Sequence, residues 1–185
     1  MPEPDPIELD SVEHLGAGAV GEPGDRAFYL QARAADARLT VLVEKEQVAL
    51  LATEAVAFLD RIADDYPEDS PVLPLTAAAL REPTVPLFRA RLIGLGFDPE
   101  RQLVLIELRE RTTSDDDEED QDDDELDLDD LVDEGDGYVA RIYATRSQVR
   151  AMAARGAEAV AAGRQLCPLC DQPMDPAGHR CPRWN

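Results

Sequence analysis

The chain has little positive charge and no long apolar run. Among 185 residues, 18 are Lys or Arg and 40 are Asp or Glu, so the formal net charge is −22. This balance argues against nucleic-acid binding, which needs cations to displace the counterions of the phosphates, and against adsorption to anionic membranes. No apolar run approaches the roughly 18 residues of a spanning helix. The first six residues lack the basic and apolar regions of a signal peptide. We therefore expect a soluble cytoplasmic protein that does not bind membranes.

The excess of negative charge is concentrated in one segment. Residues 114–136 contain 16 Asp or Glu and no Lys or Arg, whereas the other 162 residues carry 24 acidic and 18 basic groups, a net charge of −6. Like charges at this density repel, and the segment has too little apolar surface to offset chain entropy. We therefore predict a disordered acidic insert. Its few leucines could form a docking segment for a basic groove, but a solvated loop is the simpler interpretation.

Apolar periodicity predicts three strands and a helix in the first half of the chain. Alternating apolar residues indicate strands at 14–20, 26–33 and 39–43. Apolar residues at three- and four-residue steps indicate a helix from Lys45 to about Tyr66. Pro23-Gly24 has the composition of a type II turn. Residues 1–13, rich in proline and acids, are predicted to be a flexible N-terminal segment, and the linker after the helix to contain a helical turn around 77–80.

The second half has the same order of predicted elements. Strands are indicated at 88–97, 103–108 and 138–144. The following helix begins after Thr145, which forms a T-x-x-Q capping box with Gln148, and is predicted to end at Gly163 in a left-handed conformation.

We interpret this order as a duplication. Gly16-Ala17-Gly18 corresponds to Gly94-Leu95-Gly96, and residues 14–163 then form one domain with halves 14–66 and 86–163. The acidic insert would lengthen a hairpin loop, where added length costs little. Recurrent turn chemistry without duplication is the alternative. The predicted fold class is α+β, with duplicated βββα units forming one antiparallel sheet, two helices on one of its faces, and a C-terminal zinc knuckle.

The three cysteines all lie near the C-terminus, together with a histidine. They form a Cys-x2-Cys pair, eight intervening residues and a His-x-Cys pair, made of Cys167, Cys170, His179 and Cys181. Zinc prefers four Cys or His ligands in a tetrahedron, and a two-residue knuckle turn brings one Cys pair to an edge of it. An odd number of cysteines in a cytoplasmic protein disfavours disulfides. We predict a zinc knuckle in residues 164–185 with these four metal ligands and a structural Zn²⁺. A redox dithiol is the main alternative.

Other signals in the sequence do not predict catalysis. The motif Gly16-x-Gly18-x-x-Gly21 matches the dinucleotide fingerprint, but a turn and a strand follow it where a helix is required. The second histidine, His14, has no Ser or Cys partner nearby, and exposed carboxylates are the simpler interpretation of three candidate acid–base groups, Glu44, Glu46 and Glu107. Five arginines on polar strand faces could line an anion-binding face or only keep it soluble: Arg26, Arg33, Arg89, Arg91 and Arg101. Near the knuckle, Arg164, Arg180, Arg183 and Trp184 could form a recognition patch or solvate the terminus.

Two groups of motifs together resemble an uncharacterised family. Residues 21–33 (GEPGDRAFYLQAR), 167–170 (CPLC) and 178–183 (GHRCPR) are similar to actinobacterial domain-of-unknown-function family 3090, some members of which are labelled repeat proteins. The resemblance supports ligand roles for the three cysteines and His179. It implies no activity, because none is established for the family. Asp171 stands where we expect a glycine after the knuckle.

The sequence therefore predicts a non-enzymatic, zinc-binding interaction or regulatory module. We expect it to bind a protein partner, which could be a second copy of the chain in a homodimer. One alternative is an enzyme or binding domain for an anionic metabolite on the arginine-rich sheet face. Another is an acidic decoy or regulator of a nucleic-acid-binding protein, in which the insert imitates phosphates.

Overall fold

The structure is a computed structural model that describes residues 5–35, 37–69, 71–110, 137–164, 166–174 and 178–183. These residues form two α-helices and two four-stranded sheets, so the α+β class is confirmed. The prediction of one antiparallel sheet is wrong. One sheet has the order β2 (His14–Val20), β3 (Ala27–Ala34), β4 (Ala37–Val43) and β5 (Phe88–Arg89). The other has the order β1 (Ile7–Leu9), β8 (Val139–Ala144), β7 (Leu103–Arg109) and β6 (Leu92–Asp98).

The predicted strand at 88–97 is divided between the two sheets. The amide of Ala90 donates to the carbonyl of Leu42 at 2.9 Å, and the next amide, that of Arg91, donates to the carbonyl of Arg109 at 2.8 Å. The chain therefore leaves one sheet and enters the other within two residues. The alternation of apolar residues continues across this crossing, which is why it predicted a single strand.

Each half of the fold donates a short strand to the other half. Both halves consist of a short strand, a three-stranded antiparallel meander and a helix. β1 pairs in parallel with β8, and β5 pairs in parallel with β4. The outer edges of β4 and β8 are thereby occupied, so the two meanders cannot join along them into one sheet. This order agrees with a duplication, which itself stays a prediction.

The N-terminal segment is more ordered than predicted. Within its described part, β1 places Ile7 opposite Ala140 and Leu9 opposite Ile142. Leu9 and Val12 are buried in the core. Burial of a large aliphatic side chain stabilises a fold by about 1.5–3 kcal/mol. These two side chains therefore hold the segment in place, although its proline- and acid-rich composition predicted flexibility.

The local turn and loop predictions are mostly confirmed. At the predicted type II turn, Gly24 has φ +104°, and the amide of Asp25 donates to the carbonyl of Glu22 at 2.9 Å. The predicted helical turn is the 3-10 helix η1 (Leu75–Ala78). β7 and β8 are antiparallel neighbours with Arg109 opposite Val139, so the acidic segment connects a hairpin. Residues 114–136 themselves lie outside the described residues.

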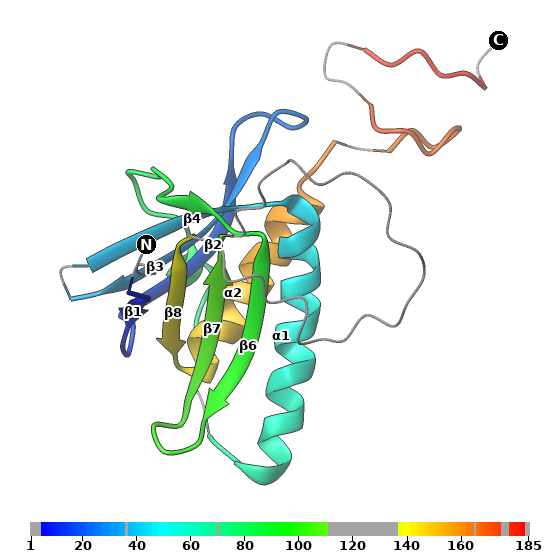
Figure 1. Ribbon diagram of the computed structural model, residues 1–185. Coiled ribbons are helices and arrows are strands. Elements are labelled where there is room, and N and C mark those ends of the chain that lie inside the picture. Colours follow the sequence, from blue (N-terminus) through cyan, green and yellow to red (C-terminus); the bar gives the residue numbers. More distant parts are fainter. Residues whose placement is uncertain are drawn as a thin grey trace, which may run out of the picture.

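The two helices are antiparallel neighbours. α1 (Lys45–Asp65) and α2 (Arg146–Ala161) lie side by side, and the sheet of β6, β7 and β8 lies in front of α2 (Figure 1). A Cβ on Gly156 would lie 3.0 Å from Cγ1 of Val48 and 3.6 Å from Cβ of Ala17. Glycine at this position therefore lets α2 approach both α1 and β2. The predicted capping box of α2 is confirmed, since the amide of Thr145 donates to Oε1 of Gln148 at 2.9 Å and the amide of Gln148 donates to Oγ1 of Thr145 at 3.3 Å.

An arginine from elsewhere in the chain satisfies the C-terminal carbonyls of each helix. Arg26 donates to the carbonyls of Ala159 and Ala162 at the end of α2. Arg146, which is buried, donates to the carbonyl of Tyr66 after α1 and forms an ion pair with Glu68 at 3.0 Å. Cations are favourable at this end of a helix, where the macrodipole is negative. Gly163 is not left-handed, so that prediction is wrong; Arg26 provides the cap in its place.

Gly16 and Gly94, each the third residue of its strand, are predicted to differ in their tolerance of alanine. A Cβ on Gly16 would lie 2.9 Å from the carbonyl oxygen of Ala78 in η1, whereas the nearest atom to one on Gly94 is 3.9 Å away. We expect Gly16→Ala to lower the free energy of unfolding by about 1–3 kcal/mol. Gly94→Ala should change it by less than about 0.5 kcal/mol. Urea unfolding of both variants tests this, and equal losses would contradict the packing of η1 on β2.

Glu107 is predicted to give the second sheet a pH-dependent stability. Its carboxylate binds Arg141 across the β7–β8 pair at 2.9 Å and Arg109 at 2.7 Å. Burial opposes ionisation of Glu107, but the hydrogen bonds from the two arginines outweigh it and lower its pKa. The contribution is therefore present above the unfolded-state pKa of about 4.3 and is lost as the pH falls through the folded-state value.

We expect Glu107→Gln to cost about 1 kcal/mol at pH 7, the upper end for a partly exposed pair. The difference from the wild type should shrink below about pH 4, as Glu107 becomes protonated. Chemical unfolding across this pH range measures it, with Glu100→Gln in the β6–β7 turn as the control. A difference that is constant with pH would show that the ion pairs do not stabilise the sheet.

Candidate metal centre

The structure brings all four predicted ligands together. One donor atom from each of Cys167, Cys170, His179 and Cys181 lies within 4.8 Å of the others. The sulfurs of Cys167 and Cys181 are 3.8 Å apart, and Nε2 of His179 is 3.2 Å from the sulfur of Cys170. A tetrahedral Zn²⁺ with ordinary bond lengths has edges of about 3.8 Å between sulfurs and about 3.6 Å between sulfur and nitrogen. The first distance matches and the second is shorter, so the residues fit a four-coordinate metal ion.

Backbone hydrogen bonds fold the Cys-x2-Cys segment into a knuckle. The amide of Asp171 donates to the carbonyl of Cys167 at 2.9 Å, and the amide of Cys167 donates to the carbonyl of Gln172 at 2.8 Å. Asp171 has φ +58°, in the left-handed region that favours glycine. This explains why the sequence led us to expect a glycine there. Asp tolerates this region better than most residues, so the turn is retained.

The knuckle prepares one thiol for metal binding. Hydrogen bonds from the backbone at Leu169 and at Cys170 stabilise the thiolate of Cys167 and lower its pKa to about 6. The thiol of Cys170 differs from that of Cys167, because burial disfavours its thiolate and raises its pKa. Because metals bind the thiolate, Cys167 offers an ionised first ligand near neutral pH.

The predicted recognition patch beside the knuckle is only partly described. The guanidinium of Arg183 donates to the carbonyl of Leu169 at 3.1 Å and so helps hold the knuckle turn. Arg164 and Arg180 are exposed, and Trp184 lies outside the described residues. Two leucines of the knuckle, Leu166 and Leu169, are 60% and 49% exposed. The surface around the metal site is therefore both apolar and basic.

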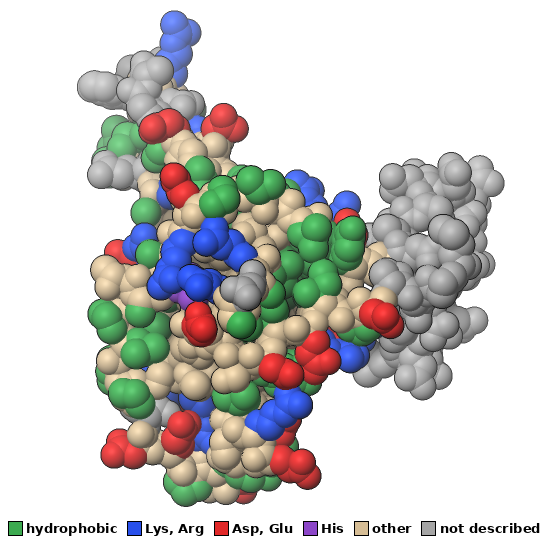
Figure 2. Space-filling view, turned by 90° about the vertical axis from the view of Figure 1, so that its left-hand side faces the viewer, with side chains coloured by type: hydrophobic (Ala, Val, Ile, Leu, Met, Phe, Trp, Pro, Cys, Tyr) green, Lys and Arg blue, Asp and Glu red, His purple; other side chains and the backbone are tan. Residues whose placement is uncertain are grey.

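His14 is not placed for catalysis. It is 3% exposed, and neither ring nitrogen has a hydrogen-bond partner among the described residues. Burial and the nearby charges of Arg81 and Arg38 lower its pKa, although the backbone of Ala77 and Ala79 acts in the opposite direction. On the face of the protein that Figure 2 shows, basic side chains gather beside a histidine. The imidazole is therefore a neutral, buried group at the start of β2.

The candidate acid–base groups do not form a common site. Glu44 binds Arg89 at 3.0 Å and Glu107 binds two arginines on its own sheet. The five strand arginines, for which an anion-binding face was one of two interpretations, are also separated. Arg33 pairs with Glu13 at 3.7 Å and Arg101 with Asp10 at 2.7 Å.

Two of those arginines, Arg26 and Arg89, line one cleft. The cleft has a volume of about 650 Å³ and is also lined by Lys45 and Arg164. The four cations come from distant parts of the chain, so sequence patterns did not predict their combination. One feature of the sequence could have pointed to the cleft, namely that Lys45 is the only lysine.

Fold and site together define an α+β domain with a C-terminal three-cysteine, one-histidine cluster. The family model described as Protein of unknown function (DUF3090) matches residues 7–181, and the chain therefore belongs to this family. The match includes every described strand, both helices and all four clustered ligands. No curated protein and no solved structure matches the chain. Neither described helix is long and apolar enough to cross a membrane.

Proposed function

We propose that the protein is a non-enzymatic module that binds a structural Zn²⁺ in its C-terminal knuckle and a partner protein through the surface around it. The observation that supports zinc most directly is the convergence of three sulfurs and one imidazole nitrogen within 4.8 Å. Thiolate and imidazole donors in a four-coordinate arrangement favour zinc over the oxygen-preferring divalent cations. Four protein ligands leave no open coordination position, which is the arrangement of structural sites.

The side chains around the knuckle favour a protein partner. Leu166 and Leu169 project apolar surface from a small loop segment, and exposed Arg180 lies in the same segment. Folding of such a short segment cannot bury these leucines, whereas a partner with an apolar pocket and acidic rim would. Leucine and arginine side chains presented together are suited to such an interface.

The absence of enzymatic activity is part of the proposal. Its support is that the candidate catalytic groups are engaged elsewhere: Glu44 and Glu107 in ion pairs, and His14 in the interior. A cytoplasmic location also belongs to the proposal, because three free thiols at a metal site persist in a reducing compartment. The acidic decoy stays a prediction, since its insert lies outside the described residues.

Zinc binding is predicted to require all four ligands. We expect the wild-type chain to contain about one zinc per molecule by elemental analysis. Cys181→Ser should reduce zinc affinity at least 10-fold in competition with a chromophoric chelator, because a hydroxyl replaces a thiolate ligand. Asp171→Gly is the matched control, since it lies in the same knuckle and keeps all donors, and it should retain full stoichiometry. Well under one equivalent of zinc in the wild type would contradict the proposal.

Partner binding is predicted to depend on the knuckle leucines. We expect Leu169→Asp to abolish capture of at least one protein that wild-type chain purifies from its native cells, as measured by quantitative mass spectrometry. Leu50→Asp is the control, because Leu50 is 63% exposed on α1. Removal of zinc with a chelator should cause the same loss. Identical sets of captured proteins from wild type and Leu169→Asp would contradict an interaction through the knuckle.

A further inference from the structure

A basic cleft lies where the body of the protein meets the knuckle. Its walls come from the β2–β3 turn, the start of β3, the end of β4, Arg89 of β5, the first residue of α1, the end of α2, and Leu166 and Pro173 of the knuckle. Four cations and a single carboxylate line it: Arg26, Lys45, Arg89 and Arg164, with Glu44. Outside the acidic insert the chain is negatively charged, with 24 acidic and 18 basic residues. The charge of the cleft is therefore opposite to that of the body around it.

Lys45 occupies an electrostatically unfavourable position for the folded chain alone. It is the first residue of α1, where the positive end of the macrodipole disfavours a cation. The adjacent carboxylate of Glu44 is engaged by Arg89 at 3.0 Å. Among the described residues Lys45 has no ion pair, and its side chain is exposed. The only lysine in the sequence is thus placed at the cleft without an ion pair among the described residues.

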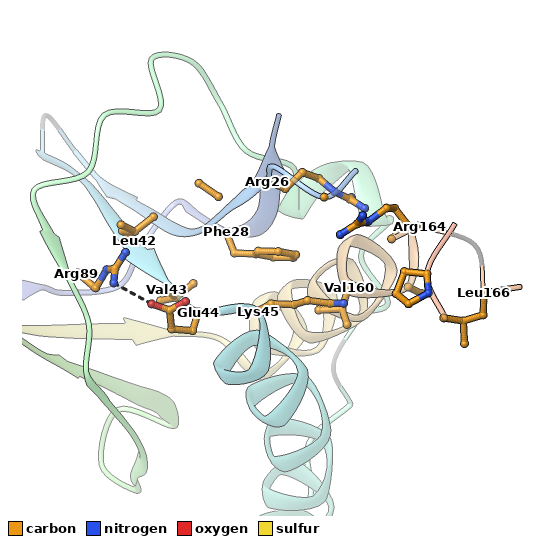
Figure 3. A pocket seen from close by; sticks show the side chains of 15 residues that line it. Arg26, Phe28, Leu42, Val43, Glu44, Lys45, Arg89, Val160, Arg164 and Leu166 are labelled. Carbon is orange, nitrogen blue, oxygen red and sulfur yellow. Dashed lines mark ion pairs between the residues drawn. The ribbon is translucent and has the colours of Figure 1, made fainter. Parts of the chain in front are cut away.

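The chain also brings two arginines to the same place. A Cβ on Gly163 would lie 3.9 Å from both Nη2 of Arg26 and Nζ of Lys45, so both head groups lie close to this residue. A Cβ on Gly24 would lie 3.0 Å from Cζ of Arg164, so the guanidinium packs on the bare backbone of the β2–β3 turn. Figure 3 shows the head groups of Arg26 and Arg164 side by side, while Arg89 lies on the opposite wall with Glu44.

From this convergence we propose that the cleft binds a phosphate-bearing small molecule, with Lys45 and Arg164 as its main contacts. A guanidinium fork matches the geometry of phosphate oxygens, and an ammonium group adds a compact positive charge. An anion between these cations removes their mutual repulsion and the unfavourable position of Lys45. Arg26, held by the carbonyls of α2, fixes one side of the site.

The size and remaining walls of the cleft indicate an organic phosphate. A volume of about 650 Å³ is within the range of small-molecule sites and exceeds what one phosphate ion fills. Apolar side chains also line the cleft, among them Phe28, Val43, Val160 and Leu166. They would contact the non-ionic portion of the ligand. Three of the cations, Arg26, Lys45 and Arg89, belong to the body, and Arg164 follows α2 directly, so none of them is a predicted metal ligand.

The single lysine permits a direct test on the full-length chain. Reductive methylation with ¹³C-formaldehyde keeps the positive charge and labels two amines, Lys45 and the α-amine, which serves as the internal reference. We titrate this protein with ATP and with inorganic pyrophosphate at constant ionic strength and follow the methyl signals by NMR. We expect a saturable shift of the Lys45 signal at millimolar ligand or below, with ATP binding more tightly than pyrophosphate. The α-amine signal should not move in parallel.

Charge-removing variants establish the location of the site. By calorimetry, Lys45→Met and Arg164→Met should each weaken ATP binding at least 10-fold. Arg150→Met removes a cation from the first half of α2, which does not line the cleft, and should change the affinity less than twofold. A Lys45 signal that does not shift up to millimolar ATP and pyrophosphate would overturn the proposal, whatever the variants do. Equal weakening by Arg150→Met and Lys45→Met would also overturn it, because binding would then follow net charge alone.

Discussion

The close contact of Gly156 with Val48 and Ala17 sets the arrangement on which both candidate sites depend. Because residue 156 has no side chain, α2 lies against α1 and β2 at once. The two helices are antiparallel, with Arg150 of α2 3.8 Å from Asp60 of α1. The first residue of α1 is consequently beside the last turn of α2. A larger residue at 156 would separate these ends, and with them Lys45 from Arg26 and Gly163.

The same end of the helix pair supports the metal centre. The knuckle begins a few residues after α2 ends, so α2 determines where its ligands start. Arg26 satisfies the terminal carbonyls of α2 and also lines the basic cleft. Leu166 and Pro173, which are bridged to each other in the knuckle, complete the wall of the cleft. A metal ion that orders the knuckle would therefore also shape the cleft.

The sequence predicted the elements that depend on residues close together in the chain, and it did not predict those that depend on residues far apart. The longer strands and both helices follow from local periodicity, and the four ligands follow from a spacing within 15 residues. β1 and β5 were missed or misassigned because strands of two or three residues have no periodicity, and their parallel partners lie far away in the chain. Gly163 was assigned the wrong conformation because the cap of α2 comes from Arg26, 133 residues from Ala159. The basic cleft was missed for the same reason, since helix packing alone brings Lys45 beside Gly163 and so to the same cleft as Arg164.

We propose that three thiolates and one imidazole hold a zinc ion in the C-terminal knuckle. X-ray absorption at the zinc edge of the purified protein tests the ligand set itself. The claim predicts a first shell of three sulfurs at about 2.3 Å and one nitrogen at about 2.0 Å. A shell of oxygen and nitrogen atoms alone, or a protein that binds no zinc when it is supplied under reducing conditions, would contradict it.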